Sequence, residues 1–318
     1  MGFAEAQYGA DEGISGVAKL LQNRINAMLV CKSTIAEDEG KTITVSDGTN
    51  AYTGKFNANL ECSFDIPGRT AYRVMVSSDG VTEFDTIVTL NAGEYKAIEV
   101  GLNTNTFKGL KNILNAHLET QYCNIGDEIT VTLNTKEVMT YRIAAINHDQ
   151  AHQLIFEPKY CMETARQMNT TDTNVGGWNA CVMREWLNGV FYQSLPDELR
   201  AVISPRTFKT SIGNQQTALQ EAVDNIWLPK EWEVFGTKTY AAATEHTTDT
   251  AQFPIYAVET NRVKTYGNAG GSANWWLSSP NAGNATAFCF VDTTGGASSY
   301  TASGAYGVIP CFQILASE

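Results

Sequence analysis

Few residues of this 318-residue sequence have the types and spacing that catalysis requires. Asn147, His148 and Asp149 are consecutive and His152 follows closely, so an imidazole could act as a general base beside an orienting carboxylate. No nucleophile is evident as a partner for them. A turn after the preceding apolar run explains Asn and Asp equally well, so we favour a structural role for this group.

The remaining histidines predict no metal site. Glu245 and His246 are adjacent, which is not the spacing of metal ligands. His117 lies inside an apolar helical pattern, where a single histidine is a packing or surface residue. We therefore expect no catalytic residue, no metal and no cofactor.

The seven cysteines are odd in number, widely scattered and without a CxxC pair. They are Cys31, Cys62, Cys123, Cys161, Cys181, Cys289 and Cys311. We expect mostly buried, reduced thiols. Pairing of Cys31 with Cys62, or of Cys289 with Cys311, stays open for an oxidising environment.

The composition indicates a folded protein and excludes two classes of partner. A hydrophobic content of 43% is sufficient for packed cores. The net charge of -12 and the lack of a Lys/Arg cluster argue against nucleic acid, since phosphate binding needs a basic surface. No apolar run approaches the ~20 residues of a membrane span, and the acidic first residues do not resemble a signal peptide. We expect neither membrane insertion nor Sec export.

The first half of the chain predicts three elements. Residues 1–30 are predicted to form one amphipathic helix. Two hypotheses for its apolar face are attachment to a particle and association with copies of itself, and packing on the core is the alternative. Its apolar stripe comprises Ile14, Val17, Ala18, Leu20, Leu21, Ile25, Met28 and Leu29. Residues 31–102 alternate in short runs between turns, which predicts a small immunoglobulin-like β-sandwich, although the Cys…Trp…Cys spacing of antibody domains is missing. Residues 103–120 have the apolar spacing of a linker helix.

Residues 121–318 predict a mixed domain, so the fold class is α+β. The runs 128–134 and 138–147 read as a β-hairpin, and 180–191 and 196–203 read as helices. Loops and short strands dominate beyond Ser204.

Six segments of this domain, in order, resemble a C-type-lectin-like domain family of gut bacteria and their phages, over about residues 125–315. They are YRIAAINHD (141–149), GGWNACVMREWLN (176–188), LPDELRAVI (195–203), NIWLPKEWEVFG (225–236), NWWLSSP (274–280) and GVIPCFQI (307–314). The family usually has an arginine where this chain has Ser278 and Ile309, which puts any site built on those arginines in doubt. Trp178, Trp186 and Leu187 should anchor a helix to the core. Trp275 and Trp276 should pack in the core, since adjacent strand residues face opposite ways and at most one could stack on a sugar.

The segment 281–306 contains no Lys, Arg, Glu, Gln, Met or Trp. Its Tyr, Ser, Asn and Gly suit an antibody-like contact surface, and also an ordinary loop. Nearly every residue of this segment can be encoded by an Asn codon whose two adenines have been changed. Diversity-generating retroelements mutate adenines at the C-terminal end of C-type-lectin-like proteins, and this chain resembles such variable proteins. Phe288, Phe290 and Val291 should hold the fold. The predicted ligand contacts are Asn281, Asn284, Thr286, Ser298, Ser299, Tyr300, Ser303 and Tyr306. A calcium-dependent sugar site is not expected, because Asp292 is the only acid.

The sequence thus predicts a non-catalytic binding protein with a cell-surface protein or glycan as partner. The resemblance implies a place on a phage particle, with residence in the bacterial cytoplasm before assembly, and display would favour a homotrimer. A bacterial surface adhesin or structural module is the alternative. A third is a formylglycine-generating-type oxidase, which needs a close cysteine pair, whereas Cys289 and Cys311 stand in separate apolar runs.

Overall fold

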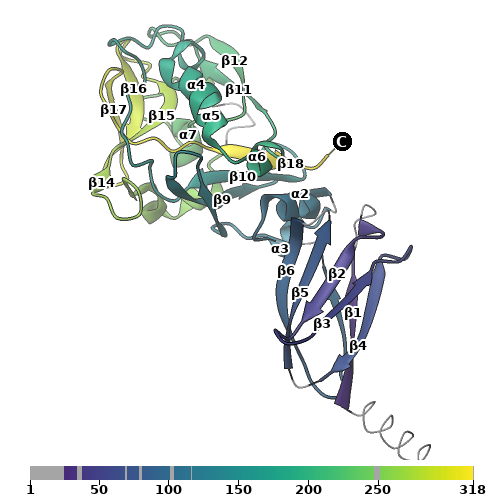
Figure 1. Ribbon diagram of the computed structural model, residues 1–318. Helices are drawn as coiled ribbons and strands as arrows, with labels where there is room; N and C mark the ends of the chain where they lie inside the picture. The colour runs from purple at the N-terminus through teal and green to yellow at the C-terminus, as the bar shows by residue number, and fades with distance from the viewer. Residues whose placement is uncertain are drawn as a thin grey trace, which may run out of the picture. The chain divides into compact units, whose positions relative to one another are not determined.

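The computed structural model describes residues 25–33, 38–68, 70–78, 81–100, 104–115, 117–246 and 251–317. The chain divides into two compact units, residues 1–112 and 113–318. Helix α2 (Phe107–Asn115) spans this division, within the predicted linker helix. The described structure is mixed α+β, with many strands and few, mostly short helices, which confirms the predicted class (Figure 1).

The first unit is a β-sandwich of two sheets. Its strands are β1 (Asn26–Lys32), β2 (Thr42–Ser46), β3 (Ala51–Lys55), β4 (Glu61–Pro67), β5 (Thr70–Ser78), β6 (Val81–Leu90) and β7 (Tyr95–Glu99). One sheet has the order β4-β1-β7 and the other β3-β2-β5-β6. Both sheets contribute to one buried apolar cluster, from Leu29 in β1 to Val74 in β5 and Val88 in β6.

The strand order differs from that of an antibody constant domain. There, the first, second, fifth and fourth strands share one sheet, whereas here β1 pairs antiparallel with β4 and parallel with β7. The predicted two-sheet sandwich is therefore present, but its strand order is not that of an antibody domain. Alternating runs specify which face of a strand is buried, but not which strands become neighbours.

The predicted N-terminal helix is wrong at its C-terminal end, because Met28 and Leu29 lie in strand β1. Ala27, Leu29 and Cys31 are buried and Met28 is exposed, as expected for a strand, and Val30 is buried as well. Pairing with β4 and β7 decides between the two patterns. Residues 1–24, the rest of that prediction, lie outside the described residues.

Strands β1 and β4 also place Cys31 directly opposite Cys62. Both are free thiols, and burial together with Cys62 raises the pKa of Cys31 to about 12. The Cys31 thiol therefore stays protonated at neutral pH.

The second unit contains a four-stranded sheet in the order β18-β10-β9-β8. It comprises β8 (Glu128–Thr132), β9 (Val138–Ile146), β10 (Gln153–Pro158) and β18 (Phe312–Leu315). Strands β8 and β9 confirm the predicted hairpin, and the last strand of the chain returns to pair antiparallel with β10. Strand β18 is thereby part of the core of this unit.

The other elements of this unit are short. The helices are α3 (Glu119–Tyr122), α4 (Val182–Trp186), α5 (Tyr192–Ser194), α6 (Asp197–Arg200) and α7 (Glu231–Phe235). A three-stranded sheet comprises β15 (Trp275–Pro280), β16 (Ala287–Val291) and β17 (Ala297–Thr301), and two pairs comprise β11 (Arg206–Ser211) with β12 (Leu219–Asp224) and β13 (Lys264–Thr265) with β14 (Ser272–Ala273). A π-helical turn, Leu187–Phe191, joins α4 to α5, so the predicted helix 180–191 is interrupted.

The prediction that Trp275 and Trp276 pack in the core is confirmed. Trp275 and Trp276 are both fully buried, so neither offers a ring to a sugar. Trp178 and Leu187 are fully buried as well, but Trp186 is half-buried. The positions where the resembled family carries arginine, Ser278 and Ile309, are also fully buried. No helix among the described residues is long and apolar enough to cross a membrane.

Candidate functional site

The C-terminal segment lies alongside a second segment, residues 165–174. Arg166 and Tyr306 exchange two backbone hydrogen bonds, of 2.8 and 3.0 Å, and the Asn169 amide donates to the Ala302 carbonyl at 3.0 Å. The backbone of 302–306 is thus paired although it is outside the named strands. Such pairing gives this surface a fixed backbone.

The buried Asn174 side chain holds the turn between β15 and β16 in place by hydrogen bonds. Its fully buried amide nitrogen donates to the carbonyls of Asn284 at 2.9 Å and Ala287 at 2.7 Å, and its amide oxygen accepts from the Asn214 backbone at 2.8 Å. Gly213 must lack a side chain, because at its φ of 68° a Cβ would run into the Asn174 carbonyl. One side chain therefore holds three chain segments together.

The predicted contact residues differ in exposure. Tyr300 and Asn284 are exposed, whereas Asn281 is buried. The half-buried ones are Thr286, Ser298, Ser299, Ser303 and Tyr306. Ser298, Ser299 and Tyr300 lie in β17, the edge strand of its sheet, so this part of the surface is open on one side.

Asn281 lies below that surface. Its amide nitrogen donates to Ser299 Oγ at 2.8 Å, and its amide oxygen accepts from the Gly283 backbone at 2.7 Å. The side chain shapes the turn between β15 and β16. Among the predicted contacts, the other seven remain accessible for a ligand.

An aromatic group supports the accessible residues. The Tyr306 ring lies 4.7 Å from the Phe290 ring, 4.8 Å from Trp276 and 5.3 Å from Tyr300, between ring centres. Phe288, Phe290 and Val291 are buried in β16, as predicted for the residues that hold the fold. Tyr300 is thus the exposed member of an aromatic group whose other end, at Trp276, is buried in the core.

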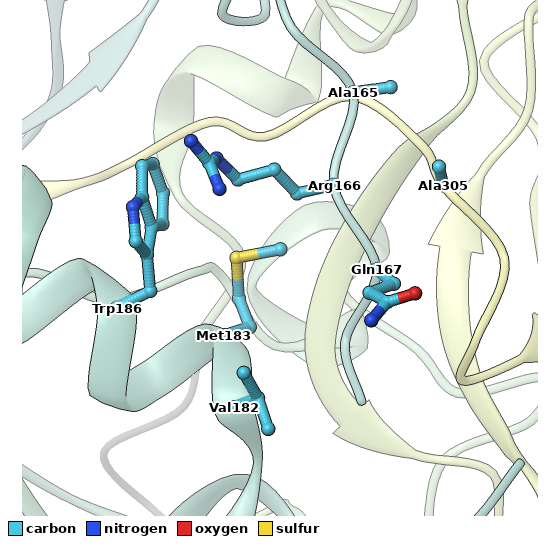
Figure 2. Close-up of a pocket in the computed structure, with 7 residues that line it drawn as sticks. All are labelled: Ala165, Arg166, Gln167, Val182, Met183, Trp186 and Ala305. Atoms are coloured by element: carbon cyan, nitrogen blue, oxygen red, sulfur yellow. The ribbon is translucent and has the colours of Figure 1, made fainter. Parts of the chain in front are cut away.

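A pocket of about 370 Å³ adjoins this surface at Ala305. Figure 2 shows its lining residues, Ala165, Arg166, Gln167, Val182, Met183, Trp186 and Ala305. The Arg166 guanidinium carbon lies 3.8 Å from the centre of the Trp186 ring. The pocket combines one cation, one aromatic face and several small or apolar side chains.

Helix α4 is fastened to the segment that carries Arg166. The Asn169 side-chain oxygen accepts from the Val182 backbone at 3.0 Å, and the Met183 backbone donates to the Met168 carbonyl at 3.1 Å. These bonds set Trp186 at the end of the helix against Arg166. Sequence reasoning missed Arg166, Gln167, Met183 and Ala305 as site residues, since no spacing or motif joins them.

The catalytic candidates His148 and Asp149 both have hydrogen-bond partners within the fold. His148 Nδ1 lies 2.8 Å from Asp149 and its Nε2 lies 3.0 Å from the Ala251 carbonyl. Asp149 also accepts from Arg206 at 2.6 Å. Burial alone would raise the pKa of Asp149, but Arg206 and His148 outweigh it and hold the pKa below its ordinary value. The carboxylate is thus a partner of Arg206.

His152 belongs to a second group. Its ring stacks on His117 with 3.5 Å between centres, and its Nδ1 lies 3.0 Å from the Glu119 carboxylate. His246 stacks on Trp232 at 4.1 Å. Within the described ranges, no cluster of three or more His, Cys, Asp or Glu side chains is arranged to hold a metal ion.

The two late cysteines are fully buried. Cys289 lies in β16, and Cys311 pairs through its backbone with Trp227. Burial raises the pKa of both thiols well above the ordinary value, and nearby carboxylates add to this effect. The thiolate form, which a reactive cysteine needs, is disfavoured at both positions.

The fold and site therefore describe a mixed α+β unit with a polar, tyrosine-containing surface beside a small pocket. The chain belongs to the family described as Domain of unknown function (DUF6273), which matches residues 138–316. No curated protein matches the chain.

One solved structure with some similarity is from Bacteroides uniformis and is described as a candidate carbohydrate binding protein. The similarity has 8% sequence identity and a TM-score of 0.18, and covers 37% of this chain and 51% of that one. The chain thus spans about half the length of that protein. A similarity this small carries no conclusion about fold or function.

Proposed function

We propose that this protein is a non-catalytic binding protein whose C-terminal unit is a C-type-lectin-like domain. The surface formed by Asn284, Thr286, Ser298, Ser299, Tyr300, Ser303 and Tyr306 recognises a cell-surface protein or glycan. The observation that carries this proposal is the exposure of Tyr300, 49%, at the end of an aromatic group rooted in the core. A rigid aromatic contact surrounded by adaptable hydroxyl groups is typical of paratopes.

The separation of the C-terminal segment into a buried strand and accessible flanks supports a diversified surface. β16 is buried along its whole length, whereas the residues of β17 are half-buried or exposed. Changes confined to the accessible positions would alter the ligand without disturbing the core. This pattern suits a variable protein of a diversity-generating retroelement, displayed on a phage particle.

The buried thiols support the non-catalytic reading. Cys289 and Cys311 are both inaccessible, and the His148 ring is occupied by two partners. An oxidase of the formylglycine-generating type would need reactive cysteines instead.

Comparison of this locus among related isolates tests the diversified surface. We expect substitutions to concentrate at adenine-derived codons of the accessible positions, with a near-identical template copy nearby. An invariant segment 281–306 contradicts retroelement targeting and leaves a fixed binding module.

Binding of the fluorescently labelled full chain to a panel of cultured gut bacteria tests the surface itself. The variant Tyr300→Arg should lose binding to every strain that the parent protein labels, because the charged side chain replaces the main exposed contact. The matched control is Ile87→Arg in the first unit, where an exposed apolar residue is replaced in the same way. Equal labelling by the Tyr300 variant and the parent contradicts the proposed surface.

A further inference from the structure

We propose that the pocket between Arg166 and helix α4 binds a ligand through a carboxylate group. The pocket of about 370 Å³ is in the size range of small-molecule sites. It lies outside the predicted contact residues, and this inference does not depend on the proposed function. The chemical class of the ligand follows from the Arg166 side chain, which lacks an acidic partner.

Arg166 differs from the other described arginines of the second unit, which all pair with an acid. The pairs are Arg142 with Glu157, Arg184 with Asp224, Arg200 with Asp197, Arg206 with Asp149 and Glu233, and Arg262 with Glu259. The Arg166 side chain has no carboxylate and no hydrogen-bond acceptor within the described structure, and its Nε is buried without a partner. The side chain as a whole is half-buried, and its terminal nitrogens are not among the fully buried polar atoms. An acceptor that enters the pocket can therefore reach these terminal N–H groups and give the cation the partner that it lacks.

Trp186 orients the guanidinium. At 3.8 Å the planar group lies over the indole ring, an arrangement that an arginine adopts and a lysine cannot reproduce. One face of the guanidinium is therefore covered, and its N–H edge is available. A carboxylate matches that edge with two parallel hydrogen bonds.

The remaining walls favour a ligand that also has an apolar face. Val182 is 42% exposed, Met183 is buried, and Ala165 and Ala305 have only methyl groups (Figure 2). None of the lining residues is acidic. Glu185 of the same helix lines a different pocket, together with Arg184. The pocket thus presents one unopposed cation on a chain whose net charge is -12.

A single guanidinium favours a carboxylate over a phosphate group. Phosphate carries more charge at neutral pH and is usually held by several cations or backbone amides. Arg166 is the only basic residue of the lining. Two sources supply a carboxylate with an adjoining apolar face: an acidic sugar and an acidic peptide side chain.

Titration of the full chain, followed by tryptophan fluorescence, tests the pocket. The probes are N-acetylneuraminic acid and glucuronic acid with glucose as neutral control, N-acetylglutamate with N-acetylglutamine as neutral control, and inorganic phosphate. We expect saturable binding of at least one acidic probe below about 10 mM, and no binding of its neutral control. The probe that binds identifies the sugar or the peptide source.

Three variants assign that binding to the pocket. Arg166→Gln and Arg166→Lys should each weaken it about tenfold or more, because both remove the forked donor, whereas Arg200→Gln should leave it unchanged. An unfolding midpoint for each variant close to that of the parent verifies folding. Should Arg166→Gln not fold, Arg166→Lys, which keeps the positive charge, takes its place. Equal binding of acidic and neutral probes, binding of phosphate alone, no binding at all, or full binding by the Arg166 variants would each overturn the proposal.

Discussion

The Arg166 guanidinium lies over the Trp186 ring, and the Arg166 backbone is paired with that of Tyr306. One residue thus joins the pocket to the C-terminal surface. A ligand that occupies both the pocket and the C-terminal surface would contact Arg, Trp and Tyr side chains. These are the residue types that contribute most to binding energy at interfaces. The stability and the binding properties of this unit can be tested separately.

All six tryptophans belong to the second unit, so their fluorescence reports its unfolding selectively. We expect Glu157→Gln to destabilise this unit by about 3–5 kcal/mol, because it leaves buried cations without their partner. Glu157 accepts from Arg142 at 2.7 Å and from Lys264 at 2.5 Å, with all three side chains buried. Urea unfolding measures the change.

The control for that experiment is Glu128→Gln. Glu128 pairs with Lys159 at 2.7 Å, but more than a third of each side chain is exposed. Its loss should cost less than about 1 kcal/mol. Similar costs for the two variants would contradict a structural role for the buried cluster.

Two neighbouring serines should respond in opposite directions to alanine. Ser278 is fully buried and its hydroxyl has no partner within the described structure, so Ser278→Ala should be neutral or stabilising by up to about 1 kcal/mol. Ser279 donates to Glu245 at 2.6 Å and accepts from the Glu231 backbone at 3.1 Å. Ser279→Ala should cost about 1–3 kcal/mol, because it leaves the buried Glu245 carboxylate short of a donor. Thermal unfolding of both variants ranks them, and the reverse order would refute this prediction.

Acid should destabilise the second unit partly through Asp149. The folded-state pKa of Asp149 is lowered, since Arg206 and His148 outweigh the effect of burial, so its ionisation stabilises the fold above the unfolded-state value of about 3.9. That stability is lost as the pH falls through the lower folded-state pKa. We expect Asp149→Asn to be less stable at pH 7 and to lose less stability between about pH 5 and pH 2 than the parent.

Urea midpoints over this pH range measure the difference. Asp197→Asn is the control, because Asp197 pairs with Arg200 on the surface and its side chain is 91% exposed. It should follow the parent curve closely. An Asp149 variant with the same pH dependence as the parent would show that this ion pair has no part in acid unfolding.

The two tyrosines of the C-terminal surface should differ in their structural cost. Tyr300→Ala should change stability by no more than about 0.5 kcal/mol, since this residue is 49% exposed. Tyr306→Ala should cost about 2–4 kcal/mol, because its ring packs against both Phe290 and Trp276. Calorimetry distinguishes these outcomes. Equal costs would mean that Tyr300 is a packing residue and not a free contact.

The sequence by itself determined the features that depend on local spacing. The alternation of 128–134 and 138–147 specified the β8–β9 hairpin, and the bulk of Trp275 and Trp276 specified the core. Burial and turn chemistry act over a few residues, so a pattern is sufficient to predict them. The class of the fold followed from the same signals.

Only the tertiary structure decided which distant segments meet. Met28 and Leu29 fit the apolar stripe of the predicted helix, but pairing with β4 and β7 places them in a strand. Trp186 lies in the segment 176–188 and Arg166 lies in none of the six segments, so no motif predicted their contact. Asn174 donates to the carbonyl of Asn284, more than a hundred residues away. These contacts depend on the global packing of the chain, because long-range neighbours are chosen by the sum of all buried contacts and leave no local periodicity.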